Sequence, residues 1–185
     1  MYYLIYSFLF HILLLQHFTG MVLNDGLFDN MSAEKWEETV SVKAQICKNL
    51  DIFTRNYCPG LEHFVMWSSV SALFGNAGQT NYGFANGSME NTCMTRKADG
   101  LSGLAIQWGL IGGVGVGVKI GMTEETNNNK QYEFAPLHID SCLQALHLHL
   151  LSSTVGVATC YLRSETDEAA TALQGASVSL LQRIA

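Results

Sequence analysis

The chain has few charged residues and no excess of basic ones. Of its 185 residues only 14% are charged, and 10 lysines and arginines stand against 16 acidic residues, so the formal net charge is −6. A protein that binds nucleic acid through its phosphates needs the opposite balance. Proline is also scarce, with two residues, whereas 48% of the chain is apolar. This composition predicts one globular domain and no nucleic-acid partner.

Paired cysteines are lacking as well. The five cysteines are an odd number, lie far apart and include no C-x-x-C pair: Cys47, Cys58, Cys93, Cys142 and Cys160. This spacing is unlike that of a zinc site or a disulfide framework. The histidines are not spaced with carboxylates in the manner of metal ligands either. We therefore expect no metal, reduced thiols packed in a core, and a cytoplasmic location.

No lysine or arginine lies in the apolar N-terminus, residues 1–15, and the first formal charge of the chain is Asp25. A secretory signal needs a basic start and a small-residue cleavage site, and neither is present. A membrane-spanning helix needs about 20 apolar residues, but the run breaks at Gln16. A signal peptide or membrane anchor stays a minor alternative. We assign residues 1–17 as a hydrophobic segment of uncertain role.

Strand-like and helix-like segments alternate along the rest of the chain. Apolar runs typical of buried strands end before Asn24 and cover residues 63–67, 104–108 and 155–160. Helical patterns lie between them: one of about five turns that Ser32 caps, then residues 81–97 and about 140–151. This order predicts an α/β fold, a Rossmann-like parallel sheet with flanking helices and right-handed crossovers. Ligands of such sheets bind beyond the carboxyl ends of the strands.

Four polar residues are placed to form a site at those strand ends. Ser69 follows the second strand, and Tyr82 and Asn86 share one face of the next helix because they are four residues apart. Lys43 lies on the preceding helix. A tyrosine has a reference pKa of about 10, which a nearby ammonium lowers. The set suits carbonyl reduction: Tyr82 gives the proton, Ser69 fixes the carbonyl oxygen, and Lys43 lowers the pKa of Tyr82.

Two longer strings add a family resemblance. The strings FVMWSSVSALFGNAGQTNYGFANGSME and GLAIQWGLIGGVGVG resemble the ketoreductase domain of animal fatty acid synthase, a relative of the short-chain dehydrogenase/reductases. The resemblance runs over about residues 21–162. It implies a partial ketoreductase domain at residues 18–162 and, at residues 163–185, a linker towards a missing acyl carrier domain.

The resemblance also implies roles for individual residues. The family's catalytic residues fall on Ser69, Tyr82, Lys43 and Asn86, with lysine and asparagine swapped relative to the usual Tyr-x-x-x-Lys order. The segment with Trp108, Gly109 and Gly112 would lie beside the nicotinamide of NADPH, and residues of about 121–134 would form a lid over the acyl chain.

The implied reaction is reduction of 3-ketoacyl thioesters on an acyl carrier protein to 3-hydroxyacyl thioesters, within a homodimeric fatty acid synthase. Polyketide synthase ketoreductases look similar but more distant. They tend to have an Asp-Asp pair where this chain has Asn24-Asp25, and a Tyr-x-Ala-Ala-Asn run where it has Tyr-Gly-Phe-Ala-Asn.

The glycine-rich turn that holds a dinucleotide pyrophosphate has no counterpart in the sequence. No G-x-G-x-x-G is present, and the glycines of residues 112–117 have the wrong spacing. We expect the second half of a ketoreductase that is inactive alone. Its open, apolar strand edge should cause aggregation or be covered by the N-terminal segment. A non-catalytic fragment and a membrane-anchored protein stay as alternatives.

Overall fold

The computed structural model describes residues 22–113, 134–152 and 155–163. The predicted strand before Asn24, the N-terminal segment, the lid and the linker lie wholly or mostly outside these residues. The described elements, in chain order, are η2 (Phe28–Asn30), α2 (Ala33–Val40), η3 (Ser41–Gln45), α3 (Ile46–Tyr57), β1 (Val65–Ser69), α4 (Ser71–Phe74), α5 (Thr80–Ala98), β2 (Leu104–Trp108), β3 (Phe134–Ala135), α7 (Ile139–Ser152), β4 (Val157–Cys160) and β5 (Leu162–Arg163).

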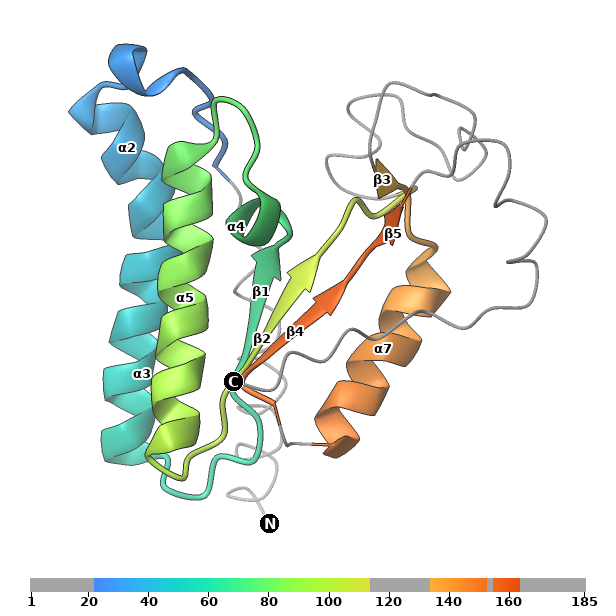
Figure 1. Cartoon of the computed structure of the whole chain (residues 1–185). Helices are drawn as coiled ribbons and strands as arrows, with labels where there is room; N and C mark the ends of the chain where they lie inside the picture. Colours follow the sequence, from blue (N-terminus) through green and yellow to red (C-terminus); the bar gives the residue numbers. More distant parts are fainter. Residues whose placement is uncertain (1–21, 114–133, 153–154, 164–185) are drawn as a thin grey trace, which may run out of the picture.

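Three parallel strands form the centre of the fold, in the order β1-β2-β4. Helices α3 and α5 cover one face of this sheet and α7 covers the other, which gives three layers (Figure 1). Each face has its own buried cluster: Met66, Met89 and Ala105 belong to the α5 side, whereas Ile106 and Ala145 belong to the α7 side. The predicted α/β class with a partial Rossmann-like sheet is confirmed.

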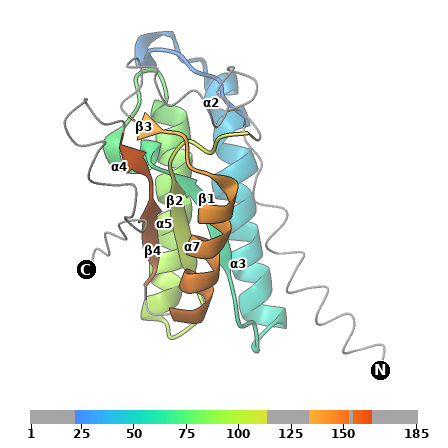
Figure 2. The ribbon, with the colours of Figure 1, turned by 90° about the vertical axis from the view of Figure 1, so that its right-hand side faces the viewer.

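The two crossovers of this sheet differ in hand. Both step in the same direction, from β1 to β2 and from β2 to β4, yet α5 and α7 lie on opposite faces. With α7 towards the viewer, the strands run from β1 on the right to β4 on the left (Figure 2). The β1–α5–β2 connection is therefore right-handed and the β2–α7–β4 connection left-handed. The expectation that all crossovers are right-handed is wrong for the second.

The first helical region is longer than expected. Ser32 caps it as predicted, because its Oγ accepts a hydrogen bond from Lys35 N at 3.3 Å. The chain then stays helical from Ala33 to Tyr57 through α2, η3 and α3, about seven turns instead of five. The middle segment, η3, is a π-helical turn. Such turns are rare and are frequent at functional sites.

The strand β1 begins and ends two residues later than its apolar run suggests. His63 precedes the strand, and Ser68 and Ser69 belong to it because they pair with Gln107 and Trp108 of β2. Serine is uncommon in a buried strand because its hydroxyl must find a partner. Here Ser68 Oγ donates a hydrogen bond to the Glu90 carboxylate of α5, which allows this polar residue to extend the strand.

Candidate active site

The four residues predicted to be catalytic lie together at the carboxyl end of β1. Tyr82 and Asn86 are buried and stand one turn apart near the start of α5. Ser69 is the last residue of β1, and its side chain hydrogen-bonds with that of Tyr82. Lys43 reaches the same place from η3, with Nζ 5.3 Å from the centre of the Tyr82 ring. The structure thus assembles the predicted set, while the catalytic roles stay a prediction.

The π-helical turn η3 presents Lys43 to this site. Lys43 is 4% exposed, and its Nζ donates to the backbone oxygen of Trp67 in β1 at 3.2 Å. Burial lowers the pKa of this amine from 10.5 to about 8, because a desolvated ammonium is disfavoured. Most of the Lys43 side chains therefore still carry a proton at pH 7.

Tyr82 behaves differently from the sequence-based expectation. We expected a nearby ammonium to lower its pKa, but the pKa of Tyr82 is raised above 10.0, mainly by burial. Hydrogen bonds with the side chains of Asn86 and Ser69 act in the opposite direction, and the charge of Asp25 adds to the rise. Tyr82 is therefore held as a neutral phenol near pH 7, the form that can donate a proton.

The side-chain amide of Asn86 is only half used within the protein. Its Nδ2 donates to the backbone oxygen of Tyr82 at 2.8 Å. Its Oδ1 is buried and has no hydrogen-bond partner among the residues that the structure describes. A buried acceptor without a donor costs about 1–3 kcal/mol. Asn86 Oδ1 therefore fits a bound group that donates a hydrogen bond.

A hydrogen-bonded chain connects Ser69 to the surface. Ser69 Oγ donates to Ser71 Oγ at 3.2 Å and accepts from Ser71 N at 3.2 Å. Ser71 Oγ donates to Gln79 Oε1 at 3.2 Å, and Gln79 Nε2 donates to Asp25 Oδ2 at 3.0 Å. The sequence pattern did not single out Ser71 or Gln79, although their position directly after a strand is the signal that could have done so.

Asn81 anchors the first turn of α5 beneath this site. It is fully buried, and its Nδ2 donates at 3.1 Å to both Asn24 O and Thr39 Oγ1. Its Oδ1 accepts from Tyr82 N at 2.8 Å. One amide thus joins α2, the loop at Asn24 and the backbone of Tyr82. The residue directly before the tyrosine is therefore a fixed part of the site's frame.

The residues expected beside the nicotinamide lie on the neighbouring strand and in the loop after it. Trp108 pairs with Ser69, but its side chain is 5% exposed and packs against Trp67 in the core, with ring centres 5.5 Å apart. A Cβ on Gly109 would lie 2.9 Å from Tyr161 Cβ, so packing alone demands glycine there. Gly112 N donates to Leu137 O at 3.0 Å. These three positions thus have structural roles, and cofactor contacts by them stay a prediction.

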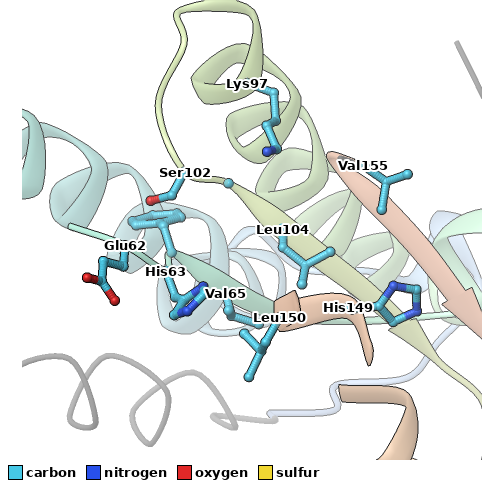
Figure 3. A pocket seen from close by; sticks show the side chains of 11 residues that line it. Glu62, His63, Val65, Lys97, Ser102, Leu104, His149, Leu150 and Val155 are labelled. Carbon is cyan, nitrogen blue, oxygen red and sulfur yellow. The ribbon is translucent and has the colours of Figure 1, made fainter. Parts of the chain in front are cut away.

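A small pocket lies at the other end of the sheet (Figure 3). Its lining includes Val65 and Leu104, the first residues of β1 and β2, together with Val155 just before β4. The cavity has a volume of about 20 Å³, which suits about one water molecule. Because parallel sheets bind their ligands at the carboxyl ends of the strands, we do not place the active site here.

Three further observations concern the expected absences. All five cysteines are free, and four of them are buried. In the parts of the chain that the structure describes, no group of three or more histidine, cysteine or acidic side chains is arranged to hold a metal ion. No helix within residues 22–113, 134–152 and 155–163 is long and apolar enough to cross a membrane.

A comparison with protein families matches the KR domain model to residues 17–113. The chain belongs to the KR domain family. Over 88 residues it is 39% identical to polyketide synthase GfsB of Streptomyces halstedii. This alignment covers 48% of this chain and 2% of that protein. Over 97 residues it is 38% identical to the reducing polyketide synthase DEP5 of Alternaria brassicicola, covering 52% of this chain and 4% of that protein.

Solved ketoreductases share the fold. An A1-type ketoreductase aligns with a TM-score of 0.71 at 21% identity, over 80% of this chain and 30% of that one. The first ketoreductase of the tylosin polyketide synthase aligns with a TM-score of 0.66 at 27% identity, over 79% and 31%. This chain thus spans only a small part of the relatives it matches. The relatives named here are polyketide synthases, so they support the KR family without singling out the animal fatty acid synthase branch.

Proposed function

We propose that this KR domain segment contributes the catalytic half of an NADPH-dependent reduction of 3-ketoacyl thioesters to 3-hydroxyacyl thioesters. The observation that supports it is the convergence of Ser69, Tyr82, Lys43 and Asn86 at the carboxyl end of β1. The substrate would be a ketoacyl chain on an acyl carrier protein, delivered within a larger, homodimeric synthase.

Each of these side chains has a distinct task in the proposed reaction. Tyr82 donates its phenolic proton to the ketone oxygen, and Ser69 donates a hydrogen bond that holds this oxygen in place. The Lys43 ammonium, beside the ring, stabilises the phenolate that remains. Asn86 fixes the first turns of α5 through the Tyr82 carbonyl and offers Oδ1 as an acceptor.

The residues present fit the reacting end of a nicotinamide cofactor. Lys43 supplies a buried donor and Asn86 Oδ1 a buried acceptor without a partner among the described residues. NADPH, when bound, supplies the hydride to the ketone carbon. A G-x-G-x-x-G turn for its pyrophosphate is absent from the sequence, so we expect the 185-residue chain to reduce no ketone unless the other half of the domain is supplied.

Two kinds of synthase are candidates for the protein in which this KR domain segment acts: a fatty acid synthase and a polyketide synthase. The strings around Tyr82 and Trp108 resemble animal fatty acid synthase, whereas the relatives named above are polyketide synthases. An antibody against residues 80–97 would size the native protein, and peptides from the same band would show which domains flank the segment. A band near the 20.3 kDa of the chain would instead favour a short, non-catalytic fragment that binds no NADPH.

The Tyr82→Phe variant tests the proposed chemistry. The full chain would be co-expressed with the N-terminal half of a ketoreductase domain, and NADPH oxidation would be followed with a short 3-ketoacyl thioester. Removing the phenolic proton should lower kcat by at least about 100-fold. Tyr57→Phe is the matched control, because Tyr57 is 72% exposed on α3. Unchanged turnover in Tyr82→Phe, or no thioester reduction by the complemented chain, would overturn the proposal.

A further inference from the structure

A row of polar side chains crosses the face of the sheet that α5 covers. Ser68, Gln107 and Thr159 are register partners on β1, β2 and β4. The cluster on the same face, nearer the start of the strands, is apolar and includes Met66 and Ala105. The row is therefore a local change of chemistry at the carboxyl end of the sheet, next to the candidate active site.

One carboxylate from α5 holds this row together. Glu90 Oε1 accepts a hydrogen bond from Ser68 Oγ, and Glu90 Oε2 accepts one from Gln107 Nε2 at 3.0 Å. Gln107 Oε1 in turn accepts from Thr159 Oγ1 at 2.6 Å. Every one of these bonds joins a donor to an acceptor. The hydrogen-bonded network therefore extends from α5 through β1 and β2 to β4.

Stability alone gives no reason for an acid at this position. Burial raises the pKa of Glu90, because desolvation destabilises the charged carboxylate. Buried hydrogen-bonded partners that are all replaced by apolar groups of the same shape can leave stability nearly unchanged. The carboxylate instead fixes the position of α5 on the sheet, because one of its oxygens binds β1 and the other binds β2.

Glu90 and its hydrogen-bond partners are close neighbours of the candidate active-site residues along the chain. It stands one helical turn beyond Asn86 and two turns beyond Tyr82 on α5. Its partners Ser68 and Gln107 directly precede the paired residues Ser69 and Trp108. A shift of α5 along the sheet would therefore break both Glu90 hydrogen bonds and separate Tyr82 from Ser69.

We propose that Glu90 is a positioning residue for ketone reduction, which sets the register of α5 against β1 and β2 and so aligns Tyr82 with Ser69. This inference rests on the proposed function. It assigns Glu90 no contact with substrate or cofactor. Its effect on the reaction passes through Ser68, Gln107 and the helix that bears Tyr82.

Two substitutions of Glu90 test whether its hydrogen bonds position Tyr82. In the complemented chain, Glu90→Leu should lower kcat by about 10- to 100-fold, as small misplacements of catalytic groups do, and leave KM within about 3-fold. Glu90→Gln keeps the length and can hydrogen-bond to both partners after the Gln107 amide turns over, so it should restore most of kcat. Glu37→Leu and Glu37→Gln are the matched controls, since Glu37 is exposed on α2.

A second readout needs no turnover. Hydrogen bonds with the side chains of Asn86 and Ser69 lower the pKa of Tyr82 against the effect of burial. NMR of isotope-labelled tyrosine in the full chain, with the Tyr82 signal assigned by Tyr82→Phe, should show a higher pKa for Tyr82 in Glu90→Leu and a value near wild type in Glu90→Gln. A residue that served packing alone would leave this pKa in place.

The outcomes separate the two proposals. If Tyr82→Phe is inactive while Glu90→Leu keeps both kcat and the pKa of Tyr82, the positioning role is wrong and the proposed function stands. If Tyr82→Phe stays active, the proposed function fails irrespective of Glu90. Equal loss of kcat in Glu90→Leu and Glu90→Gln, with unchanged Tyr82 titration in both, would also overturn the positioning role.

Discussion

The same three strands present two chemically different faces. Towards α7 they are apolar until the end of β1, with Ile106, Trp108, Ala158 and Cys160 in one buried cluster, and Ser69, which shares this side with Val65 and Trp67, is a polar exception. Towards α5 they begin apolar at Met66 and become polar at the row that Glu90 holds. Since successive side chains of a strand point to opposite faces, the two serines that end β1 separate: Ser68 joins the polar row on the α5 side, and Ser69 ends the α7 side at the candidate active site.

This difference shows where the fold can tolerate polar groups. The α7 face contains a cluster of apolar side chains, and its main contribution is burial of apolar surface. On the α5 face, Lys43 and Glu90 are both taken out of water and both have shifted pKa values. We therefore expect substitutions in the apolar cluster of the α7 face to change stability, and substitutions of Lys43 and Glu90 on the α5 face to change activity.

The largest expected effect on stability is from Ile106→Ala on the α7 face. Ile106 is fully buried in the centre of β2, so its truncation should cost about 2–5 kcal/mol of unfolding free energy, measured by urea denaturation of the full chain. Ile52→Ala on α3 is the control, because Ile52 is 51% exposed and its loss should change stability by about 0.5 kcal/mol or less. A large loss of kcat in folded Ile106→Ala would break the division between the faces.

Lys43→Met should instead raise the free energy of unfolding. The pKa difference from 10.5 to about 8 corresponds to about 3 kcal/mol of destabilisation by the charged amine. Losing the hydrogen bond to Trp67 O offsets about 1 kcal/mol. At pH 7 the variant should therefore unfold with about 2 kcal/mol more free energy than wild type, while the complemented enzyme loses activity.

The pH dependence of this gain gives a further check. The folded pKa of Lys43 lies below the unfolded value, so the unfolded chain binds more protons between pH 8 and 10.5 and folding is favoured as pH rises. Wild type should approach the stability of Lys43→Met across this window. Lys48→Met, at an exposed position on α3, is the matched control. A gain that is constant with pH would contradict burial of the charge as its cause.

Local patterns explain which elements the sequence predicts well. The boundaries of β2 match the predicted strand, and α5 differs from the predicted helix by one residue at each end. Short apolar runs and helix-start residues are read from neighbours in the chain. β1 was displaced because its last residues are serines, whose hydroxyls are satisfied by a helix that comes later in the chain.

Non-local geometry explains what the sequence did not predict. The π-helical turn that holds Lys43 and the left-handed crossover through α7 have no local motif, and both depend on how helices pack on the sheet. Ser69, Tyr82 and Asn86 were found because a family string contains them and a helix face joins the last two, and Lys43 was found as a cation on the preceding helix that the resemblance also singles out. Glu90 was missed because its partners lie on two strands, and their pairing exists only once the sheet has formed.

The smallest expected effect concerns the far end of the polar row. Thr159→Val removes the hydroxyl that donates to Gln107 Oε1 at 2.6 Å, which should cost about 1 kcal/mol in urea denaturation. Thr95→Val on α5 is the control, because Thr95 is exposed. Activity of the complemented chain should change by less than about 3-fold, since both Glu90 bonds remain. If Thr159→Val lowers kcat as far as Glu90→Leu does, the whole row aligns Tyr82, and the functional part of the α5 face extends to β4.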